Sequence, residues 1–316
     1  MNIVFAEPIG VNDNQKKLFI EEMKVIDHTV QFYSNLPFDQ DDLFNRSINA
    51  DVLVVSNYFV SKDVVEKLVN LKMIAIAFTG VDHIPLEFCK KRGIIVCNAA
   101  GYSTQAVAEL TIAMTINLIR KIVPFDSITR IGGTRNGFLG GELKGKTFGI
   151  VGFGAIGQRV AKLAQAFGCK IIAWSRSKKD FDEVEFVQLE YLLKNADIVS
   201  LHIPLNERTR GLITQKSLEL MKPNALLINT ARGPIVDSEA LHNALIQNKI
   251  AGAAIDVYEN EPPIKEDHPL FKAPNTILLP HIGFATQEEL YFFKQLTSVS
   301  GVGPKTALGV LNVSDI

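Results

Sequence analysis

Short apolar runs rich in β-branched residues alternate with helical stretches along the first third of the chain. This alternation is typical of parallel sheets covered by helices on both faces. The predicted strands are 3–6, 52–56, 73–78 and 94–97, and the predicted helices lie around 14–23, 64–69 and 85–92. We therefore expect this part of the chain to form one compact sheet unit of the α/β class.

A long helical pattern at about 103–121 precedes a polar, glycine-rich stretch at 130–145. We interpret the two segments as a crossover into a second domain. The strands predicted for that domain are 146–151, 170–174, 198–201, 225–229, 252–256 and 276–279. Six strands with helices between them suit a dinucleotide-binding fold.

Composition and charge narrow the classes of partner. The 316 residues, 47% of them hydrophobic, are enough for two cores of ordinary size. Thirty-three Lys and Arg residues against 34 Asp and Glu residues give a net charge of -1, so no overall field attracts nucleic acid or membranes. We therefore expect small neutral or anionic molecules as partners, and no membrane.

The cysteines and the start of the chain bear on the compartment. Cys89, Cys97 and Cys169 are odd in number and form no C-x-x-C pair, which argues against disulfides and against a zinc site. The chain starts with a strand-like segment rather than a signal peptide, and no apolar run is long enough to span a bilayer. We therefore expect a cytoplasmic protein without a metal.

A glycine motif directly follows the strand that ends at 151 and directly precedes a helical segment. The motif consists of Gly152, Phe153, Gly154, Ala155, Ile156 and Gly157. Its first glycine permits a tight turn, its second lets the backbone approach a pyrophosphate, and its third allows close packing of helix on sheet. The pattern alone is compatible with any turn, but a strand before it and a helix after it favour a dinucleotide site.

The end of the next strand is where NAD enzymes usually place an acidic residue that binds the adenosine ribose. Here Ser175 is followed by Arg176 and Ser177, and then by two lysines. Hydroxyl donors and positive charge favour a 2′-phosphate, so we expect NADP as the cofactor ahead of NAD. The alternative is that Arg176 stacks on the adenine and Ser175 tolerates either dinucleotide.

Three polar side chains follow three later strands: Arg232, Glu261 and His281. In a doubly wound sheet the carboxyl ends of the strands face one crevice, so these side chains can converge. A guanidinium binds a carboxylate bidentately, an imidazole exchanges protons near neutral pH, and a carboxylate orients the imidazole. Together they indicate reduction of a 2-oxo acid, whereas singly they could be an ion pair, a loop charge and a structural histidine.

Longer segments around these residues carry a resemblance to a known family. The segments are GFGAIG at 152–157, LHIPLNERTRGLI at 201–213, MKPNALLINTARGPIVD at 221–237, AAIDVYENEPP at 253–263 and PHIGFAT at 280–286. They resemble the D-isomer-specific 2-hydroxyacid dehydrogenases, which include glycerate dehydrogenase, hydroxypyruvate/glyoxylate reductase and phosphoglycerate dehydrogenase. The likeness extends from the N-terminus to about Leu290.

The resemblance implies roles for the catalytic residues. His281 would protonate the carbonyl oxygen during reduction, Glu261 would hold the histidine and favour its protonated form, and Arg232 would bind the substrate. It further implies that the backbone amides of Gly80 and Val81 bind the substrate carboxylate together with Arg232. Ser56 and Asn57, in another loop, would line the entry to the site. For these outer contacts the alternative is packing within the fold.

The resemblance also implies cofactor contacts, an architecture and an assembly. Asp256 would meet the nicotinamide carboxamide, and the other expected contacts are Thr230, Ala231, His202, Pro204, Thr209, His281 and Gly283. A flavodoxin-like substrate domain would consist of 1–98 with 282–316, and a Rossmann domain of 99–281, as two doubly wound parallel-sheet domains with a cleft between them that closes on the substrate. The segment 103–145 would build a homodimer.

The sequence departs from the family after about Leu290. Residues 300–307, SGVGPKTA, lie between two apolar segments and resemble a helix-hairpin-helix of the Holliday-junction branch-migration DNA-binding subunit. Such a hairpin binds a phosphate through backbone amides. We do not expect nucleic-acid binding, because only Lys294 and Lys305 lie nearby in a chain without net positive charge.

The sequence as a whole predicts an NADPH-linked hydroxypyruvate or glyoxylate reductase. Alternatives within the class are a D-lactate-type and a phosphoglycerate-type dehydrogenase, and no arginine at 56–61 is present to bind a phosphorylated substrate. Alternatives of another class are a dinucleotide-sensing corepressor of the same fold, which Arg232, Glu261 and His281 argue against, and a DNA-binding appendage.

Overall fold

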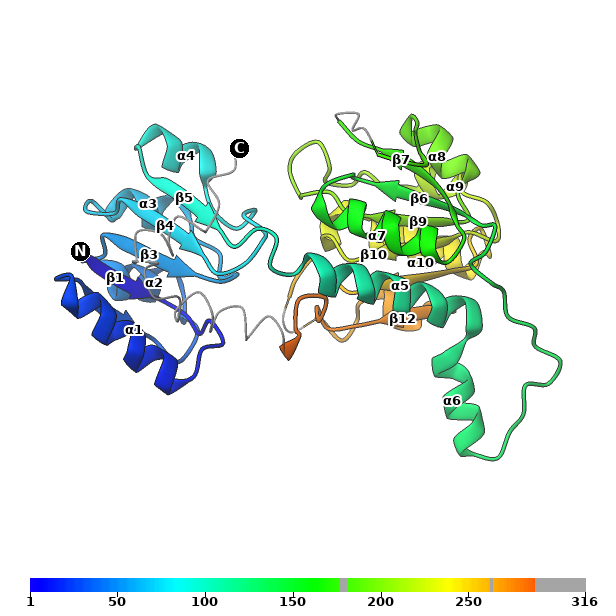
Figure 1. Cartoon of the computed structure of the whole chain (residues 1–316), viewed down its shortest axis with the longest axis horizontal. Coiled ribbons are helices and arrows are strands. Elements are labelled where there is room, and N and C mark those ends of the chain that lie inside the picture. The colour runs from blue at the N-terminus through cyan, green and yellow to red at the C-terminus, as the bar shows by residue number, and fades with distance from the viewer. Residues whose placement is uncertain (177–180, 262–263, 288–316) are drawn as a thin grey trace. The chain divides into compact units, whose positions relative to one another are not determined.

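The computed structural model describes residues 1–176, 181–261 and 264–287 (Figure 1). The chain divides into two compact units, of which one contains Met1–Ser103 and the other Thr104–Ala285. Ser177 and the hairpin-like segment 300–307 lie outside the described residues. Both units have α/β architecture, as the sequence predicts (Figure 1).

In the described part of the first unit, five parallel strands form one sheet in the order β2-β1-β3-β4-β5. The strands are β1 (Asn2–Phe5), β2 (Thr29–Phe32), β3 (Val52–Val55), β4 (Met73–Ile76) and β5 (Ile95–Asn98). The helices are α1 (Asp13–Val25), α2 (Gln40–Ser47), α3 (Lys62–Lys67) and α4 (Leu86–Lys91). This strand order is that of flavodoxin-like folds, in which the chain reverses its winding between β1 and β3.

The described strands of the second unit form a seven-stranded parallel sheet in the order β12-β11-β10-β9-β6-β7-β8. The strands are β6 (Thr147–Val151), β7 (Lys170–Trp174), β8 (Val184–Phe186), β9 (Ile198–Leu201), β10 (Leu226–Asn229), β11 (Gly252–Ile255) and β12 (Thr276–Leu278). The α-helices are α5 (Thr104–Arg120), α6 (Ile122–Arg130), α7 (Ala155–Ala166), α8 (Leu189–Asn195), α9 (Gln215–Glu219) and α10 (Ser238–Ile246). Two short 3-10 helices are η1 (Gly233–Ile235) and η2 (Pro269–Lys272).

Helices cover both faces of the second sheet (Figure 1). Residues of α5 and α7 pack on one face, and residues of α8, α9 and α10 pack in a separate cluster on the other face. Because both faces are covered, β9, β10 and β11 are buried at every position. This explains why these strands consist mainly of apolar and small residues rather than alternating polar and apolar ones.

Two edge strands and two helices were not expected from the sequence, which predicts four strands for the first sheet and six for the second. The additional strands are β2 and β8, and the helices are α2 and α6. In β2 the residues alternate between exposed and half-buried, and β8 has only three residues, so neither forms an apolar run. α6 is separated from α5 by a single residue, Lys121, whose positive φ of 52° interrupts the helix.

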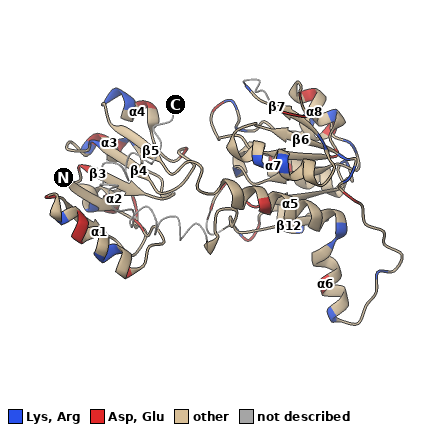
Figure 2. Cartoon of the chain, viewed as in Figure 1, with Lys and Arg blue, Asp and Glu red and all other residues tan. Residues whose placement is uncertain are grey.

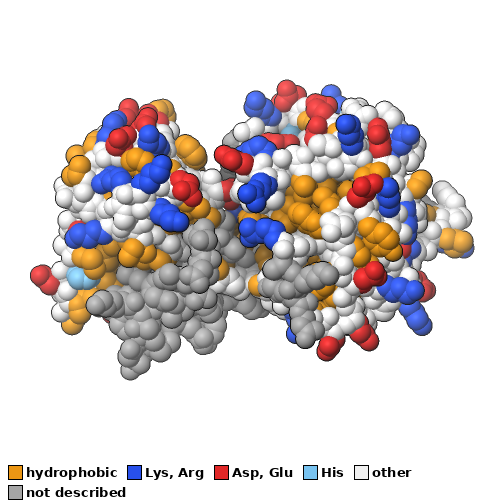
Figure 3. All heavy atoms as spheres, turned by 90° about the horizontal axis from the view of Figure 1, so that it is seen from above, with side chains coloured by type: hydrophobic (Ala, Val, Ile, Leu, Met, Phe, Trp, Pro, Cys, Tyr) orange, Lys and Arg blue, Asp and Glu red, His pale blue; other side chains and the backbone are white. Residues whose placement is uncertain are grey.

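The segment after α5 projects from the second unit (Figure 1). None of the residues of α6, all of which the structure describes, is buried. The helix packs on its own following loop, where the rings of Phe125 and Phe138 lie 4.9 Å apart. Ile131 and Leu139 expose 86% and 82% of their surface, and hydrophobic side chains are visible at the right-hand edge of Figure 3.

Charge, hydropathy and cysteines give three further findings. Acidic and basic side chains are interspersed on the helices, as along α1 (Figure 2). Within the described ranges, no helix is both long and apolar enough to cross a membrane.

Cys89, Cys97 and Cys169 are free and buried. Burial raises the pKa of the Cys169 thiol to about 11, so this thiol stays protonated at neutral pH.

Candidate active site

The candidate residues of the second unit follow neighbouring strands of one parallel sheet (Figure 1). In sheet order from β12 through β11, β10, β9 and β6 to β7, the residues that follow the strands are His281, Asp256, Arg232, His202, Gly152 and Ser175. All the strands are parallel, so these residues share the carboxyl edge of the sheet. The chain reverses its winding between β6 and β9, which is where doubly wound sheets bind their ligands.

His281 and Glu261 are in direct contact. The imidazole Nδ1 forms a hydrogen bond with one carboxylate oxygen of Glu261. The other carboxylate oxygen accepts the backbone N–H of Tyr258. The side chains of His281 and Glu261 expose only 20% and 18% of their surface, so water screens their interaction little. The structure therefore brings together two residues that are 20 positions apart in the sequence.

The backbone of His281 adopts the left-handed conformation, with a φ of 56°, which is uncommon for a residue other than glycine. Asp256 stabilises this turn, because its two carboxylate oxygens accept the N–H groups of Ile282 at 2.9 Å and Gly283 at 2.8 Å. Asp256 is 1% exposed, and burial raises the pKa of its carboxyl group. A Cβ at Gly283 would lie 2.9 Å from an Asp256 oxygen, so only glycine leaves room there.

Arg232 belongs to a turn that the buried side chain of Asn229 organises. The Asn229 amide accepts the N–H of Ala231 and donates to the carbonyl of Arg232, both at 3.0 Å. The Arg232 guanidinium donates to the carbonyl of Ala231 at 2.8 Å, and the Thr230 hydroxyl lies 3.3 Å from that of Thr111 on α5. Sequence reasoning missed the role of Asn229, although an Asn directly after a buried strand is a typical turn former.

The glycine motif forms the turn between β6 and α7. Gly152 has a φ of 101°, which favours glycine, and its N–H donates to the carbonyl of Trp174 at 2.8 Å. A Cβ at Gly157 would lie 2.1 Å from the Gly152 oxygen. At Gly154, which caps α7, no described atom lies within 4 Å of the position of a Cβ. An open backbone at the N-terminus of a helix fits a pyrophosphate.

Phe153 differs from its neighbours in this motif. Its side chain is 1% exposed and packs edge-on against Phe181 and Phe186, with ring centroids 5.1 Å away in each case. A dinucleotide at this turn can therefore meet only the backbone of Phe153. Ala155 is exposed and Ile156 is half-buried.

The residues expected on the adenosine side have mixed environments. Burial lowers the pKa of His202 to about 3, so its imidazole is neutral at physiological pH and adds no positive charge. Its Nε2 lies 2.8 Å from the Ser200 hydroxyl. The Thr209 hydroxyl donates to the exposed Pro204 carbonyl at 2.7 Å, which holds this loop in shape. At the end of β7, Ser175 is half-buried and Arg176 is exposed.

In the first unit, the predicted substrate residues lie after β3 and β4. Half-buried Ser56 and exposed Asn57 follow β3, while Gly80 and Val81 are half-buried after β4. Glu7, two residues after the end of β1, could not be singled out from the sequence. One of its carboxylate oxygens accepts the N–H of Ser56 at 2.6 Å, and burial raises the pKa of this carboxyl group. Glu7 thus fixes the loop after β3 at the point where the sheet reverses its winding.

Comparison with known proteins places the chain in a family. Residues 112–283 match the D-isomer specific 2-hydroxyacid dehydrogenase, NAD binding domain. A glyoxylate reductase of Thermococcus litoralis is 46% identical over 255 residues, which cover 77% of this chain and 76% of the relative. The chain belongs to the D-isomer specific 2-hydroxyacid dehydrogenase family.

The dehydrogenase is also similar to a second reductase in sequence and to a solved reductase in structure. A hydroxypyruvate reductase of Thermotoga maritima is 41% identical over 254 residues, which cover 79% of this chain and 83% of the relative. The solved structure of an acyclic imino acid reductase in complex with NADPH and D-Arg is similar with a TM-score of 0.85 and 32% sequence identity. The match covers 93% of this chain and 95% of the reductase chain. The dehydrogenase is thus an oxidoreductase that transfers a hydride between a nicotinamide dinucleotide and a small 2-oxo or 2-hydroxy acid.

The described side chains of the dehydrogenase offer acid–base groups and a guanidinium. Among residues 1–176, 181–261 and 264–287, no group of three or more His, Cys, Asp or Glu side chains is arranged to hold a metal ion. The chemistry that these residues can perform is proton transfer by His281 and binding of an anion by Arg232.

Proposed function

We propose that the dehydrogenase reduces hydroxypyruvate or glyoxylate with NADPH. The observation that carries this proposal is the contact between His281 and Glu261 at the carboxyl edge of the sheet, two strands away from the Arg232 turn. A proton donor and a cation that binds carboxylate are the two groups that reduction of a 2-oxo acid requires from the protein. Relatives named glyoxylate reductase and hydroxypyruvate reductase support this choice of substrate.

In the proposed reaction, His281 donates a proton to the carbonyl oxygen of the substrate. Glu261 engages Nδ1, so we assign the proton transfer to Nε2. Arg232 binds the substrate carboxylate, and the nicotinamide, when bound, supplies the hydride. In the first unit we assign substrate contacts to the amides of Gly80 and Val81 and to the loop of Ser56 and Asn57.

The cofactor is proposed to bind along the edge from the glycine motif to β12. The pyrophosphate would meet the N-terminus of α7, and the ribose would meet the end of β7. Ser175 with Arg176 there favours NADPH over NADH, because a 2′-phosphate gains a hydroxyl donor and a cation. We assign Arg176 to this phosphate, since the neutral His202 adds no positive charge.

The remaining cofactor contacts keep their expected roles as proposals. Thr230 and Ala231 would pass beside the nicotinamide ribose, and Pro204 and Thr209 beside the adenosine. Asp256 would accept a hydrogen bond from the nicotinamide carboxamide N–H. Each carboxylate oxygen has a second lone pair besides the one that accepts the N–H of Ile282 or Gly283.

A steady-state panel tests the proposed substrate and cofactor. Hydroxypyruvate, glyoxylate, pyruvate and phosphohydroxypyruvate are each assayed with NADPH and NADH, and kcat/KM values are compared. We expect the highest values for hydroxypyruvate or glyoxylate with NADPH. A preference for pyruvate or phosphohydroxypyruvate would instead assign the chain to a lactate-type or phosphoglycerate-type activity, and a preference for NADH would refute the assignment of Arg176.

We also propose that the segment 103–145 builds a homodimer. The exposed apolar surface of α6 and its following loop supports this assembly, since Ile122 and Val123 also expose 51% and 55% of their surface. Replacing Ile131 with Glu should shift the protein to monomer in analytical ultracentrifugation, whereas Glu190→Ala on α8 should not. A dimer that persists unchanged in Ile131→Glu would place the interface elsewhere.

A further inference from the structure

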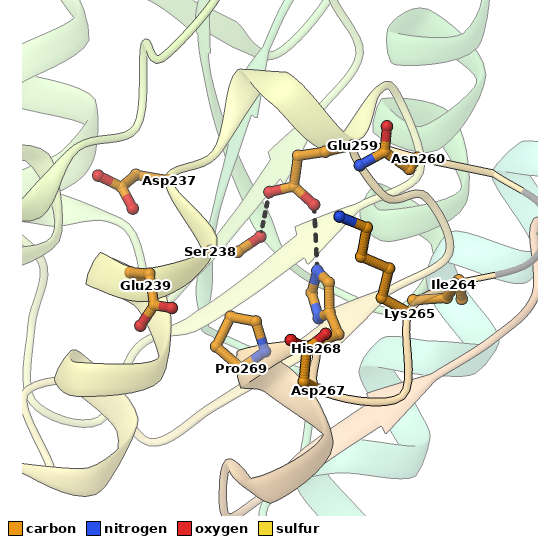
Figure 4. Close-up of a pocket in the computed structure, with 10 residues that line it drawn as sticks. All are labelled: Asp237, Ser238, Glu239, Glu259, Asn260, Ile264, Lys265, Asp267, His268 and Pro269. Atoms are coloured by element: carbon orange, nitrogen blue, oxygen red, sulfur yellow. Dashed lines mark hydrogen bonds and ion pairs between the residues drawn. The ribbon is translucent and has the colours of Figure 1, made fainter.

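The loop that carries Glu261 is tied to two other elements by the residue two positions before it (Figure 4). One carboxylate oxygen of Glu259 accepts the hydroxyl of Ser238, the first residue of α10. The other oxygen lies 3.1 Å from Nε2 of His268. Figure 4 shows Ser238 and His268 side by side, each facing a different oxygen of the carboxylate. We call these three residues, Ser238, Glu259 and His268, the clasp.

The ring of His268 is held firmly. Its Nδ1 accepts the backbone N–H of Leu270 at 3.4 Å at the start of η2, which makes Nε2 the nitrogen that donates to Glu259. Tyr258 packs edge-on against the ring with centroids 5.3 Å apart, and Phe271 lies 5.7 Å away on η2. The side chain of His268 is only 11% exposed. A rigid histidine therefore anchors the carboxylate of Glu259.

The clasp fixes Glu259, two residues before Glu261, and thereby restricts the position of Glu261. A residue whose side chain is held by two hydrogen bonds leaves fewer backbone conformations to the residues next to it. Glu261 in turn binds Nδ1 of His281. The position of the proton donor thus depends, through two carboxylates, on a histidine and a serine that lie outside the catalytic set.

The clasp also adjoins the turn of Arg232. A Cβ at Gly233 would lie 2.0 Å from the carbonyl carbon of Tyr258 and 2.5 Å from the backbone nitrogen of Glu259. The backbone after Arg232 therefore packs directly on the backbone at the start of the clasped loop. Displacement of Glu259 would first disturb the carboxylate of Glu261, which contacts His281. It would also disturb the turn of Arg232 through this backbone contact.

We propose that the clasp positions Glu261, and through it His281, for proton transfer to the substrate. This inference rests on the proposed function of His281. Ser238, Glu259 and His268 are positioning residues in this scheme, because they act through Glu261. Their loss slows the chemical step, since a misplacement of about 1 Å can cost roughly 100-fold in rate.

Single-turnover kinetics test the clasp. Enzyme in excess over NADPH is mixed with the best substrate of the panel, and the absorbance of NADPH is followed. Glu259→Ala and His268→Ala should lower the rate constant of hydride transfer roughly 10- to 100-fold at nearly full amplitude, with the Kd for NADPH unchanged. A purely structural role would lower the amplitude, which counts active molecules, and leave the rate constant unchanged.

Two matched variants sharpen the test. His268→Gln keeps an N–H donor where Nε2 lies, so it should restore most of the rate that His268→Ala loses. Ser238→Ala removes one bond to Glu259 and should have a smaller effect, which keeps the test usable if Glu259→Ala fails to fold. The control is Glu190→Ala, which removes an exposed carboxylate paired with Lys194 on α8 and should not change the rate.

A spectroscopic measurement separates failure of this inference from failure of the proposed function. In protein labelled with ¹⁵N-histidine, the His281 signal is assigned among the six histidines by its loss in His281→Asn. Glu259→Ala should shift the Nδ1 signal of His281, whereas Glu190→Ala should not. An unshifted signal overturns the clasp, and so does a wild-type rate constant in Glu259→Ala when His281→Asn is inactive. A shifted signal in a protein whose His281 variants keep full activity would support the clasp and reject the proposed role of His281.

Discussion

Replacing His281 with alanine should lower kcat for 2-oxo acid reduction by about 10²- to 10⁴-fold, the range that a positioned general acid contributes. The imidazole donates the proton that the carbonyl oxygen receives, and alanine has no proton to donate in its place. In the variant Glu261 keeps its bond to the Tyr258 N–H, which holds its carboxylate in the loop. Binding of NADPH should remain largely intact, because the pyrophosphate site lies at the N-terminus of α7. Steady-state kinetics and fluorescence titration with NADPH measure the two quantities.

The backbone of His281 calls for a matched variant. Alanine adopts a φ of 56° less readily than histidine, so His281→Ala should also unfold somewhat more easily. Asparagine tolerates this conformation better, so His281→Asn should lose the same activity with less loss of stability. Substitution of His28, in the first unit, serves as the control. Near-normal turnover in either His281 variant would reject the assignment of the proton donor.

The central strands and the order of the site residues were predictable because they depend on local patterns. Buried parallel strands such as β9 and β10 appear as mainly apolar runs, and polar residues at their ends must share one edge of the sheet. The edge strands β2 and β8 escaped prediction, because a short strand with one solvated face carries little apolar signal. The family resemblance supplied the individual roles of the side chains.

The supporting contacts of the site were not predictable, because they join residues distant in sequence through atoms that no motif describes. Glu7 binds the backbone after β3, and Glu259 binds His268, yet each is one acid among 34 acidic residues. The left-handed backbone conformation of His281 could not be predicted from the sequence either, since it is stabilised by the two hydrogen bonds that Asp256 accepts. A sequence indicates which groups perform the chemistry more readily than which groups hold them in place.

Replacing Gly154 with alanine should abolish dinucleotide binding without harming the fold. Gly154 has a φ of -75° and a ψ of -166°, which any residue adopts, and no described atom lies within 4 Å of the position of a Cβ. The folded protein therefore has room for the methyl group, and its stability should stay the same or rise by about 0.4–1 kcal/mol through a less flexible unfolded chain. A bound pyrophosphate would need that same space, because it approaches the backbone closely. We expect Kd for NADPH and for NADH to rise at least roughly 100-fold, a loss of about 2.7 kcal/mol of binding free energy.

Gly157→Ala provides the opposite case in the same turn. Its Cβ would lie 2.1 Å from the Gly152 oxygen, so α7 must shift away from β6, and this variant should lose both stability and dinucleotide binding. Thermal unfolding measures the stability of the two variants, and calorimetric titration measures their Kd for the dinucleotide. Together they distinguish a glycine that the fold requires from a glycine that only the ligand requires. If Gly154→Ala binds both dinucleotides as the wild type does, the open backbone at the start of α7 does not receive the pyrophosphate, and the cofactor must bind elsewhere on the edge of the sheet.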